Sequence, residues 1–123
     1  MAAKDNTDII FNKNEDYNKT QVSNLQHKIG IVSEGGGKKN GDKQKEKGKL
    51  LVRERIDYLL DQGSPALEIG AFAAEGMYKE YGGCPSAGVV VVIGYIHGRQ
   101  CIVVANDATV KAGAWFPKKE KKN

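Results

Sequence analysis

Residues 88–105 have the sequence GVVVVIGYIHGRQCIVVA, and this stretch decides the fold. Its two runs of β-branched residues predict strands over Ala87–Ile96 and Cys101–Ala105. The four residues between them, 97–100, include Gly98, which suits the positive φ of a tight hairpin turn. Because both runs are continuously apolar instead of alternating, we expect strands that need cover on both faces of the sheet.

A helix is predicted upstream, from Asp16 to Val32. Apolar residues recur there at Val22, Leu25, Ile29 and Val32, the spacing of a narrow helical stripe. Asn14 is the expected N-cap, and the glycines at 35–37 are expected to end the helix. A stripe one residue wide cannot stabilise an isolated helix, so we interpret this segment as a docking helix.

The next segment, 38–49, has six lysines and no apolar residue, so we predict a solvated linker. A second amphipathic helix is expected from Leu50 to Gly63. Its predicted apolar face is made of Leu50, Leu51, Ile56, Leu59 and Leu60. Residues 67–69 are predicted to form a short strand, and these elements cannot cover both faces of the apolar hairpin.

The composition excludes several classes of protein. The 123 residues include 19 Lys and Arg against 15 Asp and Glu, a formal charge of +4. The sequence contains neither a run of about 20 apolar residues that would span a membrane nor a signal peptide, so a cytoplasmic location is expected. Two cysteines, Cys84 and Cys101, are predicted to be reduced thiols.

Most candidate chemical motifs have a simpler structural explanation. The separation of Gly36 and Gly41 fits a phosphate loop, but Asp42 stands where the essential lysine is required. The lysines of 38–49 lack interleaved aromatic residues, so a nucleic-acid partner is not expected. No group of residues has the spacing of metal ligands. Asp107 is expected to cap the turn that follows it, and a role as a general acid or base is the less favoured alternative.

The segment Lys111–Gly113 is the candidate binding site. A strand that ends in small residues exposes backbone N–H groups, which a thioester carbonyl or a phosphate can approach closely. A tight turn beneath a neighbouring strand is the alternative explanation.

Three segments carry a resemblance to a known family. Residues 48–61 (GKLLVRERIDYLLD), the hairpin 88–105, and residues 106–117 (NDATVKAGAWFP) resemble the carboxyltransferase (β) subunits of biotin-dependent acyl-CoA carboxylases. The Val-Lys-small-Gly sequence at 110–113 is similar to the methylcrotonyl-CoA type. Ala112 and Ala114 stand where many members have Gly and a hydroxyl residue.

The resemblance implies an α/β fold, the ClpP/crotonase-like spiral of β-β-α units, present here as a partial N-terminal portion with a leading helix. It divides the chain into a leader (1–37), a linker (38–49) and the start of a carboxyltransferase N-terminal domain (50–123). It also implies carboxylate transfer from carboxybiotin to an acyl-CoA such as 3-methylcrotonyl-CoA, with Lys111 and Gly113 on the CoA side. The family's oxyanion-hole glycines would follow residue 123, so no catalytic residue is assigned and the isolated chain is expected to be inactive.

The resemblance further implies a partner subunit that carries biotin carboxylase and the biotin carrier, and a homo-oligomer in the full-length form. A non-catalytic module that docks on a full-length carboxylase subunit is the alternative function. A basic nucleic-acid binder is a third hypothesis, and it depends on the lysines of 38–49 alone.

Overall fold

The structure is a computed structural model that describes residues 6–114. It forms two compact units that meet in sequence between Ile31 and Val32. The elements are α1 (Asn6–Ser33), α2 (Lys38–Glu46), α3 (Val52–Leu59), β1 (Leu67–Ile69), β2 (Val89–Ile96) and β3 (Arg99–Asn106). Short 3-10 turns lie at Lys79–Tyr81, Pro85–Gly88 and Lys111–Gly113.

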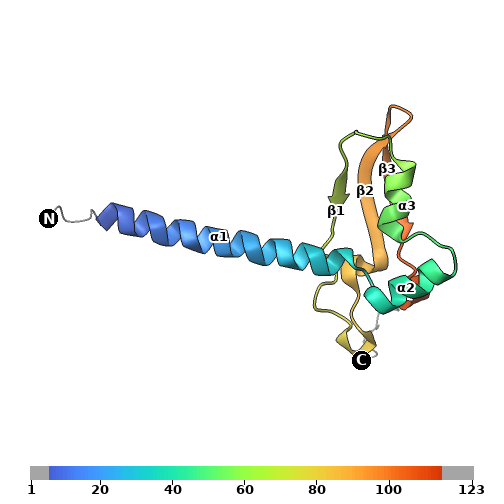
Figure 1. Ribbon diagram of the computed structural model, residues 1–123, viewed down its shortest axis with the longest axis horizontal. Helices are drawn as coiled ribbons and strands as arrows, with labels where there is room; N and C mark the ends of the chain where they lie inside the picture. Colours follow the sequence, from blue (N-terminus) through green and yellow to red (C-terminus); the bar gives the residue numbers. More distant parts are fainter. Residues whose placement is uncertain (1–5, 115–123) are drawn as a thin grey trace, which may run out of the picture. The chain divides into compact units, whose positions relative to one another are not determined.

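The strands form an antiparallel sheet in the order β1-β2-β3 (Figure 1). The predicted hairpin and the short strand at 67–69 are both confirmed. The hairpin loop is two residues long, since Ile96 pairs with Arg99. His97 and Gly98 both have positive φ, at 50° and 75°, as a type I′ turn requires.

Helix α3 packs on one face of this sheet, beside β2 and β3 (Figure 1). The core consists of Val52, Ile56 and Leu60 from the helix side and Val90, Val92 and Ala105 from the strands. Gly94 lets the helix approach closely, because a Cβ at this position would lie 2.8 Å from a methyl carbon of Leu60.

The prediction of which residues form the apolar face of α3 was partly wrong. Leu50 and Leu59 are exposed, at 52% and 48% of their surface, whereas Val52 is buried. The buried residues follow an i, i+4, i+8 spacing, which keeps one narrow stripe against the sheet. Helix α3 is also shorter than expected, because residue 60 already has an extended backbone.

Asp61 ties the end of α3 to the hairpin turn. Its two carboxylate oxygens accept hydrogen bonds from the backbone N–H groups of His97 and Gly98, each at 2.7 Å. Its own N–H donates to the carbonyl of Tyr95 at 2.8 Å. The N–H groups of Gly98 and His97 lower the pKa of the Asp61 carboxyl, because they stabilise its charged form.

We predict that the contribution of Asp61 to stability depends on pH. A carboxyl with a lowered folded pKa stabilises the fold above the unfolded pKa of about 3.9, and this contribution is lost as pH falls through the lower folded value. Asp61→Asn should lower the melting temperature at pH 7 by a few degrees and have little effect near pH 2. Thermal unfolding of both proteins from pH 2 to 7 tests this, and an equal difference at every pH would contradict it.

Helix α1 is longer than predicted. It begins at Asn6 instead of near Asn14, because no Gly or Pro interrupts residues 6–29. The stripe residues Val22, Leu25 and Ile29 are about half exposed, and Val32 is buried at the start of the second unit. No described helix has the length and hydropathy needed to cross a membrane.

Residues 38–46 form helix α2, so the prediction of an unstructured segment here was wrong. Contacts with the rest of the second unit stabilise it. Gly41 is buried against the methyl groups of Leu51, at 3.7 and 3.8 Å from the position of an added Cβ. Lys45 pairs with Glu54 at 3.2 Å. The order therefore comes from glycine packing and an ion pair, which a search for apolar residues does not detect.

The other face of the sheet is apolar and uncovered by any described element. Strand pairing aligns Leu67 with Ile93 and Ile102, and Ile69 with Val91 and Val104. Leu67, Ile69, Ile102 and Val104 expose 63%, 46%, 69% and 66% of their surface. The expectation that the elements of this chain cannot cover both faces of the hairpin is therefore confirmed for the described residues, and exposed apolar rows of this kind promote association.

We expect Ile102→Thr combined with Val104→Thr to reduce aggregation with little loss of stability. Threonine retains β-propensity while it removes apolar surface from this face. Light scattering and gel filtration measure the effect. Val90→Thr is the control, since Val90 is only 1% exposed and a hydroxyl there should cost roughly 1–3 kcal/mol of unfolding free energy. A wild-type chain that is equally monomeric at high concentration would contradict the prediction.

Candidate functional site

The loop that leaves β3 is built on a buried Asp-Thr turn. Oδ1 of Asp107 accepts hydrogen bonds from the N–H of Thr109 at 2.9 Å and from its hydroxyl at 2.6 Å. Both residues are less than 10% exposed. Asp107 therefore caps the turn, as the sequence predicted, and this fixes the exit direction of the chain toward residues 111–113.

The glycines after α1 clamp this turn. The N–H of Gly36 donates to the Thr109 hydroxyl at 2.8 Å, across 73 residues of sequence. A Cβ at Gly36 would overlap the carbonyl oxygen of Thr109, and one at Gly35 would overlap the Asp107 carboxylate. Asn40 completes the clamp, because its side-chain amide donates to the carbonyls of Gly36 and Thr109 at 3.0 and 3.3 Å.

The candidate residues Lys111 and Gly113 lie at the two ends of a left-handed turn. Lys111, Ala112 and Gly113 all have positive φ, at 44°, 53° and 80°. The N–H of Gly113 donates to the carbonyl of Val110 at 2.9 Å, so this donor is already used within the turn. In the described part of the chain, the N–H of Ala112 has no partner, and Ala112 is exposed. The structure thus points to an amide donor at Ala112, which the sequence argument did not single out.

The surroundings of Lys111 do not form a nucleophilic site. Its ammonium lies over the ring of Tyr81, 5.4 Å from the centroid. Cys84 is buried, and desolvation raises the pKa of its thiol, so it is protonated near neutral pH. Both cysteines are free, as expected. No cluster of metal-ligating side chains occurs within residues 6–114.

We predict that Gly36→Ala loosens the candidate site. The new Cβ must displace the Thr109 carbonyl, at a cost of roughly 1–3 kcal/mol in unfolding free energy. Amide hydrogen exchange at residues 109–114 should become faster.

Gly30→Ala is the matched control, since an added Cβ there meets no atom within 4 Å. It should leave exchange at 109–114 unchanged and favour α1 by about 0.5–1 kcal/mol. Wild-type exchange rates at 109–114 in the Gly36→Ala protein would show that the close approach does not hold the loop.

In the Arg-Glu-Arg sequence at 53–55, the side chains of the first two residues have partners within the fold and that of the third does not. Arg53 pairs with Glu68 at 2.7 Å and reaches the carbonyls of Val32 and Ser33 at 3.5 and 3.3 Å. Glu54 accepts the N–H of Leu51 at 2.8 Å, and this bond together with Lys45 lowers the Glu54 pKa. Among the described residues, the side chain of Arg55 makes no hydrogen bond or ion pair.

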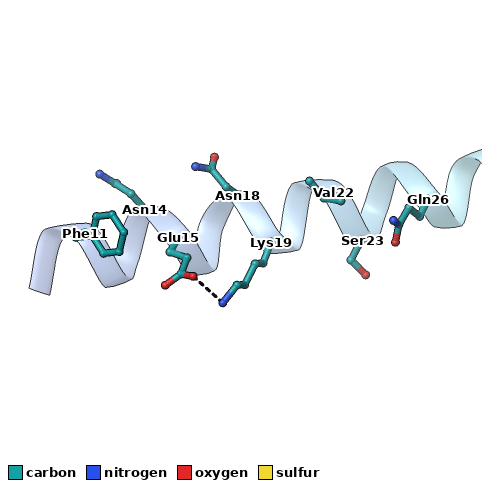
Figure 2. A pocket seen from close by; sticks show the side chains of 8 residues that line it. All are labelled: Phe11, Asn14, Glu15, Asn18, Lys19, Val22, Ser23 and Gln26. Carbon is teal, nitrogen blue, oxygen red and sulfur yellow. Dashed lines mark ion pairs between the residues drawn. The ribbon is translucent and has the colours of Figure 1, made fainter. Parts of the chain in front are cut away.

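Helix α1 carries a separate surface groove of about 460 Å³. The groove is lined by Phe11, Asn14, Glu15, Asn18, Lys19, Val22, Ser23 and Gln26 (Figure 2). Glu15 and Lys19 form an ion pair across one helical turn at 2.9 Å. Since all eight residues belong to one helix, the groove is an open helix surface and not an enclosed cavity.

Part of the sequence signature lies outside the described residues. The aromatic pair and proline at 115–117 and the charged end at 118–121 are in this range. The site described here is therefore limited to residues 106–114 and the groups that hold them.

Two curated relatives of this chain are β subunits of methylcrotonyl-CoA carboxylases. The chain is 44% identical over 108 residues to the biotin-dependent 3-methylcrotonyl-coenzyme A carboxylase β1 subunit of Mycobacterium tuberculosis, a match that covers 88% of this chain and 20% of that protein. It is 47% identical over 103 residues to the mitochondrial methylcrotonoyl-CoA carboxylase β chain of Dictyostelium discoideum, with 83% and 17% covered. The chain thus spans about a fifth of the length of these relatives.

Solved structures agree with the sequence relatives. A transcarboxylase 12S hexamer structure with methylmalonyl-coenzyme A bound superposes with a TM-score of 0.70 at 32% identity, covering 78% of this chain and 19% of that one. The β subunit of geranyl-CoA carboxylase from P. aeruginosa also gives 0.70, at 30% identity, with 85% and 19% covered. These neighbours support the crotonase-like α/β fold, of which the described residues form a partial portion with a leading helix. Since residues 43–123 also match the carboxyl transferase domain family, the chain belongs to that family.

Proposed function

We propose that this chain supplies part of the CoA side of a carboxyltransferase that moves carboxylate from carboxybiotin to an acyl-CoA, with 3-methylcrotonyl-CoA as the favoured substrate. The match of residues 43–123 to the carboxyl transferase domain carries the proposal. The identity to methylcrotonyl-CoA carboxylase subunits supports the choice of substrate.

The 111–113 turn is the part of the described chain that we assign to substrate. Lys111 and Gly113 would border the bound CoA, and the N–H of Ala112 would donate a hydrogen bond to a carbonyl or phosphate oxygen. The clamp of Gly35, Gly36 and Asn40 supports this role, because it holds the turn before ligand arrives.

Biotin, a partner subunit and the rest of the full-length β subunit would supply what the reaction needs beyond this chain. A biotin carboxylase and a biotin carrier on a partner subunit would form and deliver carboxybiotin, and the full-length β subunit would be a homo-oligomer. Biotin would carry the carboxylate, while backbone amides would stabilise the enolate of the acyl-CoA. The 123-residue chain by itself would be inactive, because no described residue has a catalytic arrangement.

A chimera tests the proposal. Residues 43–123 replace the aligned segment of the M. tuberculosis β1 subunit, and transfer of labelled bicarbonate to 3-methylcrotonyl-CoA is measured with its biotin-carrying partner and ATP. We expect activity within about tenfold of the parent, because the two segments share a domain family and 44% of their residues over 108 positions. The 123-residue chain assayed alone should transfer no label.

The opposite results would favour the alternative function. A chimera that assembles but transfers nothing, together with a 123-residue chain that co-purifies with an intact subunit, would indicate a non-catalytic docking module that uses the α1 surface.

A further inference from the structure

We propose that Asn40 is a deamidation site whose reaction the fold controls, and that the product cannot rebuild the clamp on the turn at 107–109. Asn40 and Gly41 form the only Asn-Gly pair in the 123 residues. Glycine after asparagine favours deamidation, because no side chain hinders the approach of the glycine nitrogen. Asn40 is exposed, so water reaches its side-chain amide. The reaction requires no acyl-CoA ligand.

Deamidation at this position needs only the two residues and water. The backbone nitrogen of Gly41 attacks the side-chain carbonyl carbon of Asn40, and a new C–N bond forms. The C–N bond to the side-chain amide breaks, and that nitrogen leaves as ammonia with the proton of the Gly41 N–H. Water then opens the cyclic succinimide at either carbonyl, which leaves aspartate or isoaspartate at position 40. No oxidant or reductant takes part.

The folded backbone keeps the attacking nitrogen engaged elsewhere. The N–H of Gly41 donates to the carbonyl of Gly37 at 3.0 Å, and the N–H of Asn40 donates to the same carbonyl at 3.1 Å. The amide that must leave is also held, since it donates to the carbonyls of Gly36 and Thr109 at 3.0 and 3.3 Å. Ring closure requires the backbone at residue 40 to leave the helical conformation and these bonds to break. The clamp therefore protects Asn40.

Helix α2 is the element whose opening would permit the reaction. It has nine residues, of which four are lysines and one is an interior glycine. A helix of this length is marginal without tertiary contacts, and the glycine weakens it further. Its order depends on the Asn40 bonds, the packing of Gly41 and the ion pair of Lys45. We therefore expect α2 to open locally while the β2-β3 hairpin stays folded.

The product has the opposite hydrogen-bonding character at position 40. An asparagine amide offers two N–H donors, whereas an ionised carboxylate only accepts. The carboxylate would face the carbonyl oxygens of Gly36 and Thr109, so two donated bonds would be replaced by two repulsive contacts. Isoaspartate also adds a methylene to the main chain and interrupts the helix. One opening followed by reaction would thus release the loop at 109–114 permanently.

The rate test compares the complete chain, in the double threonine background that limits aggregation, with a peptide of residues 36–46 that lacks the clamp. Both are incubated at mildly alkaline pH, and conversion at position 40 is measured by peptide mapping with mass spectrometry. We expect conversion in the chain to be at least about tenfold slower than in the peptide. Gly36→Ala should raise the rate in the chain severalfold, whereas Gly30→Ala should not, because only the first substitution displaces Thr109.

Gly41→Ala is the matched control for the chemistry. An added Cβ at this position lies 3.7 and 3.8 Å from the methyl groups of Leu51, which is ordinary contact, so the clamp should persist. The alanine side chain hinders attack by its own nitrogen. Conversion at Asn40 should therefore fall severalfold or more in the peptide and in the chain alike.

Asn40→Asp tests the consequence, because it carries the product side chain from the start. Amide hydrogen exchange at 109–114 should become about tenfold faster. Exchange within β2 and β3 should stay slow, which shows that the sheet is folded. Gln44→Glu makes the same change from amide to acid one turn later in α2. Among the described residues the Gln44 side chain makes no hydrogen bond, so exchange at 109–114 should not change.

Two kinds of result would overturn the proposal. Equal conversion in chain and peptide, no conversion in the peptide, or an unchanged rate in a folded Gly36→Ala chain would show that the fold does not control a reaction at this site. Wild-type exchange at 109–114 in Asn40→Asp, or an equal change in Gln44→Glu, would show that the product leaves the clamp intact. The comparison of the chain with the peptide needs no substitution at the clamp, so it decides the first point even if Gly36→Ala fails to fold.

Discussion

The close approach of Gly36 to Thr109 is the constraint on which the second unit depends. It joins the segment after α1 to the exit of the last strand, with nearly all of the described second unit between them. Two adjacent residues without side chains are required there, because the space that a Cβ would need is taken by Thr109 and Asp107. Asn40 in the first turn of helix α2 bonds to both sides of this contact, and this adds to the packing of Gly41 that orders the helix.

Helix α3 is the second organising element, and residues on its different sides have different contacts. The buried stripe of Val52, Ile56 and Leu60 covers the sheet. Arg53 binds β1 through Glu68 and donates hydrogen bonds to two carbonyls at the end of α1, those of Val32 and Ser33. Arg55 extends from a different side of the same helix, and its charge is not used by the described fold.

The sequence predicted those parts of the fold that follow from local patterns. The valine-rich hairpin and the Asp107 turn were found because β-branched runs and an aspartate before a turn have local physical causes. Helix α2 was missed because its order comes from Gly41 packing on Leu51 and from a pair between Lys45 and Glu54. Asp61 and Asn40 were missed for the same reason, since their partners lie more than 30 residues away. At the candidate site, the family resemblance indicated Lys111 and Gly113, but only the backbone geometry shows that the N–H of Gly113 is used internally and that of Ala112 is not.

The same long-range contact has a consequence for the order of folding. The β2-β3 hairpin closes a two-residue loop, whereas the contact of Gly36 with Thr109 closes one of 73 residues. Loop closure grows with the logarithm of length, so the long contact costs roughly 2–3 kcal/mol more in chain entropy and forms after the hairpin. During synthesis, residues 35 and 36 emerge well before their partner. Gly35 and Gly36 therefore cannot contact their partners until the ribosome has released the turn at residue 109. The hydrogen bond from Asn40 of α2 to the Thr109 carbonyl cannot form before then either.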